Sequence, residues 1–147
     1  MDEGEAIPRL RAARVGRLAT VTPDGSPHVV PLVFVLLERD GGLVAYWVVD
    51  EKPKRSRRLQ RLRNIETNPS VAILVDEYSD DWRQLWWVRA DGTGRMVRSR
   101  SERVAALDAL RAKYQQYANT PPAGPLVAVD IERVTGWAAG DASPGRA

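Results

Sequence analysis

A run of basic residues near the middle of the chain is the part of the sequence best suited to bind an anion. Seven of the 22 Lys and Arg residues fall between positions 52 and 63, and no acidic residue interrupts them. Pro53 favours the first turn of a helix, where free backbone N–H groups and the helix dipole add partial positive charge. Lys52, Lys54 and Arg55 would add full charges at the same place. The segment is therefore predicted to bind phosphate.

Two other interpretations of this segment stay open. A helix this basic could be a solvated surface helix, or it could contact the backbone of a nucleic acid. Nucleic-acid binding is disfavoured because no aromatic residue between positions 52 and 64 could stack on a base. The formal net charge of the chain is also only +3, so the positive charge is local.

Side chains that catalyse reactions without a cofactor are scarce in this chain. His28 is the only histidine, cysteine is absent, and no Ser/His/Asp pattern stands out. We therefore assign no catalytic residue and interpret His28 as structural. Residues 76–81 are interpreted as a solvated acidic turn, so no metal site is expected. This scarcity suits an enzyme whose cofactor carries the reactive atoms.

Length and composition predict one domain over residues 1–138, followed by a flexible tail at 139–147. The 147 residues are enough to bury a sizeable core without disulfides. No stretch approaches the roughly 18 apolar residues of a membrane span, and the absence of cysteine fits a reducing compartment. A soluble cytoplasmic protein without membrane contact is the expectation.

The elements that must position the basic segment begin with a short helix and three strands. Asp2 is a plausible cap for the helix. The turn at 22–26 contains Pro23 and Gly25, which favour a hairpin. The predicted helix covers residues 3–14, and the predicted strands cover 15–21, 27–37 and 43–49. We expect these strands to follow one another as an antiparallel meander.

The second half of the chain predicts two helices and further strands. Leu59, Leu62 and Ile65 give the basic helix one apolar edge. Ser99 and Glu102 fit a capping box for the longest helix, over 99–118. Its expected buried stripe is Val104, Leu107, Leu110 and Tyr114. A fully buried strand is predicted over 71–75, a strand that bends or bulges at 90–94 over 85–98, and a final strand over 126–137.

This order of elements predicts a mainly β, α+β fold: a small barrel of six or so antiparallel strands with helical additions. A Rossmann fold is disfavoured because the chain has no Gly-rich strand-to-helix turn.

The sequence also resembles a known family. Residues 16–31, GRLATVTPDGSPHVVP, resemble the opening hairpin of the pyridoxamine 5′-phosphate oxidase-like split β-barrels, which share the FMN-binding fold. The basic segment, followed by Asn68, Pro69 and an apolar strand, is similar to the branch that uses the deazaflavin coenzyme F420. Residues 134–137, VTGW, resemble the terminal strand of that branch. The resemblance extends over roughly residues 5 to 138.

The resemblance implies a homodimer with cofactor sites at the subunit interface. The phosphate would lie on Lys52, Lys54, Arg55 and Arg58. The ring would lie against Val30, Pro31, Leu32 and Val33, with Val48 and Val49 completing the floor.

The Trp-rich stretch after the acidic turn is a candidate for the substrate pocket. Trp82 and Trp87 are the candidate residues, and Arg17 or Arg89 could polarise a carbonyl group of the substrate. The alternative is that this stretch forms the core of the dimer interface.

The resemblance implies an F420-dependent oxidoreductase that transfers hydride to a small electron-poor or conjugated substrate. The cations at Arg55, Arg57, Arg58 and Arg61 exceed what one phosphate requires and would suit the carboxylates of the F420 tail. An FMN-binding oxidase or reductase of the pyridoxamine-phosphate oxidase type is the first alternative. A non-catalytic F420-binding protein is the second.

Overall fold

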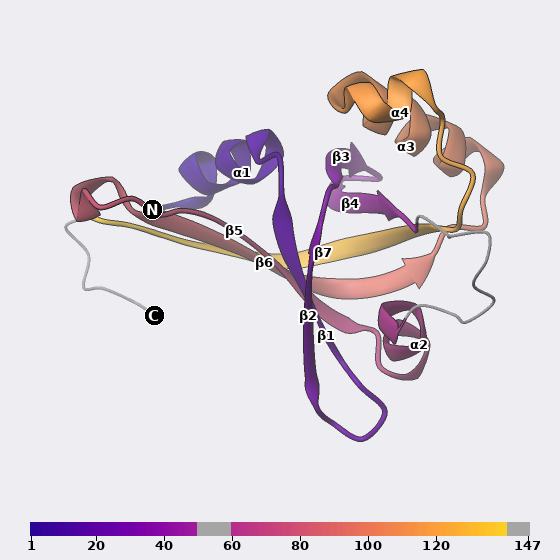
Figure 1. Ribbon diagram of the computed structural model, residues 1–147, viewed down its shortest axis with the longest axis horizontal. Helices are drawn as coiled ribbons and strands as arrows, with labels where there is room; N and C mark the ends of the chain where they lie inside the picture. Colours follow the sequence, from indigo (N-terminus) through magenta and orange to yellow (C-terminus); the bar gives the residue numbers. More distant parts are fainter. Residues whose placement is uncertain (50–59, 141–147) are drawn as a thin grey trace.

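The predicted α+β split-barrel fold is confirmed. The computed structural model describes residues 1–49 and 60–140, and over this part of the chain it contains a seven-stranded antiparallel sheet in the order β2-β1-β5-β6-β7-β4-β3 (Figure 1). The strands are β1 (Gly16–Val21), β2 (Pro27–Leu32), β3 (Val35–Arg39), β4 (Gly42–Val48), β5 (Ser70–Glu77), β6 (Trp86–Met96) and β7 (Leu126–Ala138).

The helices lie around this sheet. They are α1 (Glu3–Ala12), α2 (Gln60–Thr67), α3 (Arg100–Lys113) and α4 (Gln115–Asn119), with a short 3₁₀ helix η1 (Trp82–Gln84). Asp2 caps α1 through a capping box with Glu5, as predicted for Asp2. Figure 1 shows α3 and α4 together beyond β3 and β4, at a distance from α2. In the described ranges, no helix has both the length and the apolar character that a membrane crossing requires.

The predicted meander is wrong, because the expected strand over 27–37 is two strands. The chain bends at Val33 and Phe34, which we call the β2–β3 corner. β2 pairs with β1, whereas β3 pairs with β4 at the opposite end of the strand order. Along the corner and β3, side chains alternate between two buried clusters: Phe34 and Leu36 belong to the first, and Val35 belongs to the second.

One prediction about the central strands is wrong and another is confirmed. β5 is not fully buried: Val71, Ile73 and Val75 face the interior, whereas Ala72 and Leu74 are partly exposed on the other face. The sequence shows no polar alternation here because the outward residues are also apolar. The predicted bend or bulge at 90–94 is confirmed as a register shift between Asp91 and Gly92 within one continuous strand, β6.

The late helix is also divided. Ser99 caps α3 as predicted, since its side chain accepts the Glu102 N–H at 3.3 Å. The helix ends at Lys113, and Tyr114 separates it from α4, so the continuous helix over 99–118 is wrong. Leu110 and Tyr114 are buried as expected, but Val104 is 52% exposed.

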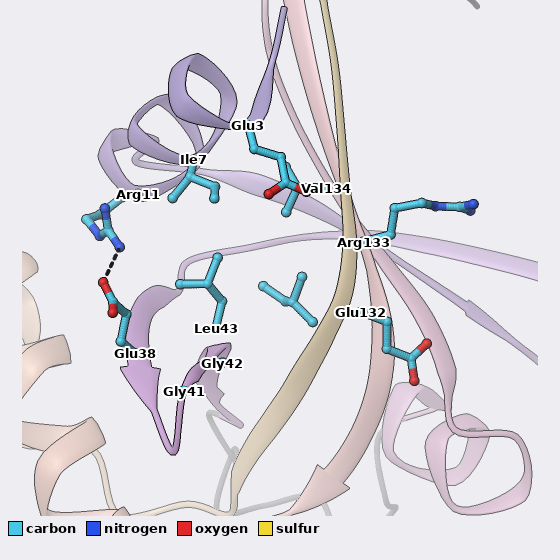
Figure 2. Close-up of a pocket in the computed structure, with 11 residues that line it drawn as sticks. Glu3, Ile7, Arg11, Glu38, Gly41, Gly42, Leu43, Glu132, Arg133 and Val134 are labelled. Carbon is cyan, nitrogen blue, oxygen red and sulfur yellow. Dashed lines mark ion pairs between the residues drawn. The ribbon is translucent and has the colours of Figure 1, made fainter.

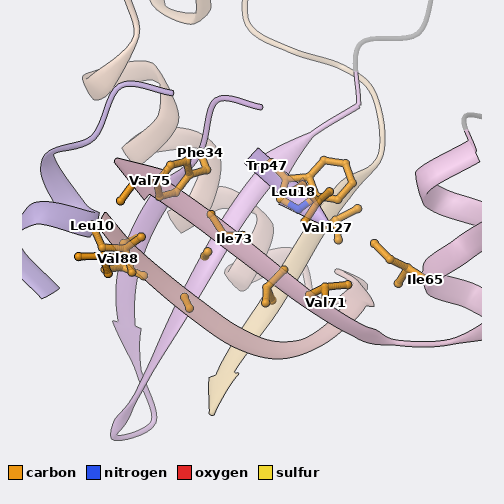
Figure 3. Close-up of a cluster of buried hydrophobic side chains, with 14 of the residues drawn as sticks. Leu10, Leu18, Phe34, Trp47, Ile65, Val71, Ile73, Val75, Val88 and Val127 are labelled. Carbon is orange, nitrogen blue, oxygen red and sulfur yellow. The ribbon is translucent and has the colours of Figure 1, made fainter. Parts of the chain in front are cut away.

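Two buried clusters hold the fold together. The first fills the barrel interior, where Figure 3 shows Leu18, Phe34, Ile73, Trp47 and Val127 from strands far apart in the sequence. The second packs β3, β4 and β7 against α3 and contains Val35, Val44, Tyr46, Val48, Ala106, Leu110, Tyr114, Leu126 and Ala128. Because β4 contributes to both clusters, it is buried on both faces.

The helix α2 closes one part of the barrel with its apolar edge. Leu62 and Ile65 are buried in the first cluster, as predicted, whereas Leu59 lies outside the described residues. Asn64, a polar residue of the same helix, is also completely buried. Its amide donates to Thr20 Oγ1 at 2.9 Å and accepts from Gln60 Nε2 at 2.7 Å, which compensates for its burial and fixes α2 on β1.

Candidate functional site

A pocket of about 260 Å³ lies where the β2–β3 corner, the end of β4, α2 and α4 meet. We call it the corner pocket. Its lining residues are Val15, Pro31, Leu32, Val33, Trp47, Val48, Arg61 and Tyr117. Apolar and aromatic side chains predominate, and among the described lining residues Arg61 carries the charge.

The corner pocket brings together most of the residues predicted to contact a cofactor ring. Pro31, Leu32 and Val33 line it from β2 and the corner, and Val48 lines it from β4. The other two predicted residues lie elsewhere: Val30 packs against the barrel core, and Val49 is completely buried in it.

The residues predicted to bind phosphate are Lys52, Lys54, Arg55 and Arg58, and they lie outside the described residues. Described residues on either side of residues 50–59 nevertheless line the corner pocket. Val48 lines the pocket just before the segment, and Arg61 lines it just after. Two residues that line the pocket are therefore close in the sequence to the predicted phosphate-binding residues.

Tyr114 fixes the β2–β3 corner from the far end of α3. Its hydroxyl accepts the Phe34 N–H at 3.1 Å and lies 2.9 Å from the Phe34 carbonyl oxygen and 3.0 Å from that of Arg14. Either carbonyl can accept the hydroxyl proton. Burial raises the pKa of Tyr114, so the hydroxyl stays protonated and keeps this role.

Lys113 reinforces the same corner. Its ammonium donates to the Phe34 carbonyl at 2.8 Å and to the Arg11 carbonyl at 3.3 Å. It also lies over the Phe34 ring, 4.5 Å from the ring centroid. Burial lowers the pKa of Lys113 to about 8. Sequence patterns did not reveal this contact, because Lys113 lies 79 residues from Phe34.

Trp47 is a functional candidate that the sequence analysis missed. Its side chain is 1% exposed, and the guanidinium of Arg61 lies 5.5 Å from its ring centroid. Within the described part of the chain, the buried indole Nε1 has no hydrogen-bond acceptor. An apolar run of strand residues gives no signal for such a donor.

These properties fit one end of a planar heterocycle. Apolar residues can pack against its faces, while a cation and a buried N–H are suited to its oxygen atoms. The volume of about 260 Å³ is small beside the roughly 300–1,000 Å³ of typical ligand pockets. One chain alone therefore encloses only part of a ligand of that size.

A second pocket, of about 450 Å³, lies on the outer face of the sheet. We call it the sheet-face pocket. It is lined by Arg17, Ala19, Val29, Ala72, Leu74, Asp76, Tyr78, Trp87 and Arg89. The strand register places Pro31 opposite Arg17, Arg17 opposite Leu74, and Leu74 opposite Arg89. The corner pocket and the sheet-face pocket are therefore neighbours across β2 and β1.

Three residues predicted to act on a substrate meet in the sheet-face pocket. Arg17, Trp87 and Arg89 line it together, with the Arg89 guanidinium 5.9 Å from the centroid of the Trp87 ring. Asp91 accepts a hydrogen bond from Arg89 Nε at 3.2 Å and steadies the guanidinium. Trp82, the other predicted residue, lies in η1 with 75% of its surface exposed.

A third hollow, of about 440 Å³, lies among α1, the β3–β4 turn and β7 (Figure 2). Figure 2 shows Arg11 pointing toward Glu38, and their charged groups are 3.9 Å apart. Glu3, Glu132 and Arg133 add charges of both signs. This mixed surface contains no residue predicted to bind cofactor or substrate.

Acidic and imidazole side chains do not form a metal centre in the described ranges 1–49 and 60–140, where no three His, Cys, Asp or Glu residues come together. His28 lies on β2 and is partly buried.

Comparison with known proteins identifies relatives of this chain. A family model described as pyridoxamine 5′-phosphate oxidase matches residues 3–138. A 5a,11a-dehydrotetracycline/5a,11a-dehydrooxytetracycline reductase from Streptomyces rimosus is 37% identical over 71 residues. That match covers 48% of this chain and 46% of the reductase, so it spans less than half of the relative.

Two solved structures illustrate the likeness of fold. A conserved protein of unknown function from Corynebacterium diphtheriae superposes with a TM-score of 0.71 at 22% identity, covering 95% of each chain. An FAD-binding protein from Mesorhizobium loti gives a TM-score of 0.65 at 26% identity, covering 92% of this chain and 94% of its own.

Proposed function

The chain belongs to the pyridoxamine 5′-phosphate oxidase family, and we propose that it is an oxidoreductase that uses coenzyme F420 to reduce a conjugated double bond. The observation that carries this proposal is the corner pocket. It gathers Pro31, Leu32, Val33 and Val48 into one apolar surface. Its lining also includes Arg61, so lining residues lie on both sides of Lys52, Lys54, Arg55 and Arg58 in the sequence.

A flavin-type ring in the corner pocket is supported by the pocket and by one relative. The lining suits a flat heterocycle, and the Mesorhizobium loti relative is described as FAD-binding. F420 is favoured over FMN because seven Lys and Arg residues lie between positions 52 and 63, more charge than one phosphate needs. When bound, the deazaflavin would supply the hydride.

The protein's own contribution is to hold and orient the reactants. Among the described lining residues of the corner pocket there is no carboxylate or imidazole, so these residues position the ring and exclude water from it. Tyr114 and Lys113 keep the corner in place through Phe34. Precise placement of the ring is worth much of the rate in hydride transfer.

The sheet-face pocket is the proposed substrate site. Leu74 and Trp87 offer an apolar floor and an aromatic wall, and Arg17 and Arg89 flank Leu74 in the strand register. A planar substrate with carbonyl or enolate oxygens fits this combination. The name of the Streptomyces rimosus relative, a dehydrotetracycline reductase, is in line with an oxygen-rich planar substrate.

A homodimer is part of the proposal. The corner pocket of one chain is small for a whole cofactor, and the sheet-face pocket beside it is open. Val29 and Tyr78 at that pocket are 61% and 67% exposed. A second copy placed over this face would enclose both pockets and bury apolar surface.

An FMN-dependent oxidase or reductase is the second candidate, because the FAD-binding relative covers almost the whole chain. Non-catalytic binding of F420 is the third, since the described pocket lining lacks acid–base groups.

Turnover distinguishes these candidates. The protein should oxidise reduced F420 when a cyclic enone with several oxygen substituents is added, and reduced FMN should not replace F420. Turnover with FMN alone would select the flavin enzyme. Tight F420 binding without turnover of enones or quinones would select the storage protein.

A further inference from the structure

We propose that Trp47 donates a hydrogen bond from its indole Nε1 to an oxygen or ring nitrogen of the heterocycle bound in the corner pocket. The inference rests on the proposed function, because it concerns a ligand of that pocket. It assigns a specific contact to a residue that otherwise belongs to the barrel core.

Among the described residues, none accepts a hydrogen bond from this donor. Trp47 belongs to a buried cluster with Leu18, Leu62, Ile65 and Val127, which are apolar side chains. The guanidinium over its ring belongs to Arg61, whose N–H groups are donors and cannot accept a hydrogen bond. Indole Nε1 likewise donates only.

The missing hydrogen bond matters because the donor is buried. The Nε1 atom is buried and has no acceptor among residues 1–49 and 60–140. A buried donor is normally paired with protein, water or ligand, because leaving it unpaired costs the full desolvation of the group. Trp47 lines the corner pocket together with Arg61. We therefore assign the missing acceptor to a ligand bound in that pocket.

The positive charge beside Trp47 narrows the class of ligand. A guanidinium and an N–H donor side by side favour an electron-rich acceptor such as the carbonyl oxygen of a pyrimidine-dione ring. FMN and F420 both carry such a ring, whereas an apolar ligand would leave the donor unpaired. The contact would therefore contribute to recognition of the ring. It would not discriminate between FMN and F420, and we assign that discrimination to the basic segment.

The test compares Trp47→Phe with Trp86→Phe as a matched control. Trp86 also packs against the barrel core, but it does not line the corner pocket. Each protein is titrated with F420, with FMN, and with their phosphate-free chromophores, and thermal unfolding checks the fold. We expect Trp47→Phe to weaken binding of every chromophore by about 5- to 20-fold, and Trp86→Phe to leave it nearly unchanged.

A spectroscopic readout keeps the test independent of protein stability. In ¹⁵N-labelled wild-type protein, the Trp47 indole N–H resonance, assigned by its loss in Trp47→Phe, should shift downfield when the phosphate-free chromophore binds. Unchanged affinity and an unmoved resonance would overturn the inference. A loss of affinity confined to the phosphorylated ligands would also overturn the ring assignment. Failure of the wild-type protein to bind any of these ligands would instead refute the proposed function.

Discussion

At the scale of single residues, Tyr114 has the clearest structural role near the proposed site. One hydroxyl satisfies the buried Phe34 N–H and also lies within hydrogen-bonding distance of two carbonyl oxygens. Together with Lys113, which donates to the Phe34 carbonyl, Tyr114 connects the end of α3 with the β2–β3 corner.

Tyr114→Phe should therefore lower stability and weaken cofactor binding together. Removing the hydroxyl leaves the Phe34 N–H without its acceptor, which should cost about 1–3 kcal/mol in the free energy of unfolding. Urea unfolding measures this cost. Tyr78→Phe, at a residue that is 67% exposed, is the control and should be nearly neutral. Equal stability of the two variants would contradict the role given to Tyr114.

Arg89 should act on the substrate and not on the cofactor. Arg89→Gln is expected to raise KM for a carbonyl-bearing substrate about tenfold, because a charged hydrogen bond is lost, while the Kd for cofactor stays unchanged. Arg17→Gln should behave similarly. Arg83→Gln is the control, since Arg83 lies in η1 with a 90% exposed side chain. If the Kd for the cofactor rose together with KM, these arginines would act on cofactor binding, which would contradict their assignment to the substrate site.

At the scale of elements, α3 is joined to the sheet by a buried ion pair. Glu102 is 4% exposed and accepts hydrogen bonds from Arg95 at 2.9 and 2.7 Å and from Tyr46 at 2.6 Å. Arg95 also donates to Asp130 on β7 at 2.7 Å. Hydrogen bonds from Arg95, followed by the one from Tyr46, hold the pKa of Glu102 at about 2.

This carboxylate predicts acid-dependent stability. The folded pKa lies below the ordinary value of 4.5, so the stabilisation is complete above about pH 4.5 and is lost as the pH falls toward 2. The loss should be on the order of 3 kcal/mol. Denaturant unfolding between about pH 6 and about pH 2 measures it. Glu102→Gln should flatten this pH dependence, and an unchanged slope in that variant would show that other carboxylates cause it.

The sequence predicted the elements better than their connections. Periodicity is a local property, so α1, β1, α2, β6, α3 and β7 were recognised near their observed positions. The corner at Val33 and Phe34 was missed because a residue 80 positions away fixes it. The late helix was predicted to continue through Tyr114 because its apolar spacing continues there. In the structure α3 ends at Lys113, and the Tyr114 side chain bonds to the distant corner.

The candidate site was predicted in part. The resemblance to the family located Pro31, Leu32, Val33 and Val48, which the structure gathers around one pocket. It could not separate these from Val30 and Val49, because inward and outward residues on these strands are all apolar. Trp47, Lys113 and Asn64 were missed because their roles depend on burial and distant partners.

At the scale of the whole molecule, the open face of the sheet is the proposed dimer interface. Leu74→Glu would place a charge in the centre of that face and should convert the dimer into monomers, measured by sedimentation velocity. Val104→Glu, on a residue of α3 that is 52% exposed, should leave the dimer intact. A wild-type protein that stays monomeric at the concentrations used for cofactor titration would contradict the proposed assembly.

The most direct test of the central claim is a titration of purified, cofactor-free protein with F420 and, separately, with FMN, followed by tryptophan quenching and cofactor fluorescence. We expect micromolar or tighter binding of F420, clearly weaker binding of FMN, and weakened F420 binding in Val33→Asp at the lining of the corner pocket. A preference for FMN, or F420 affinity that Val33→Asp leaves unchanged, would contradict it.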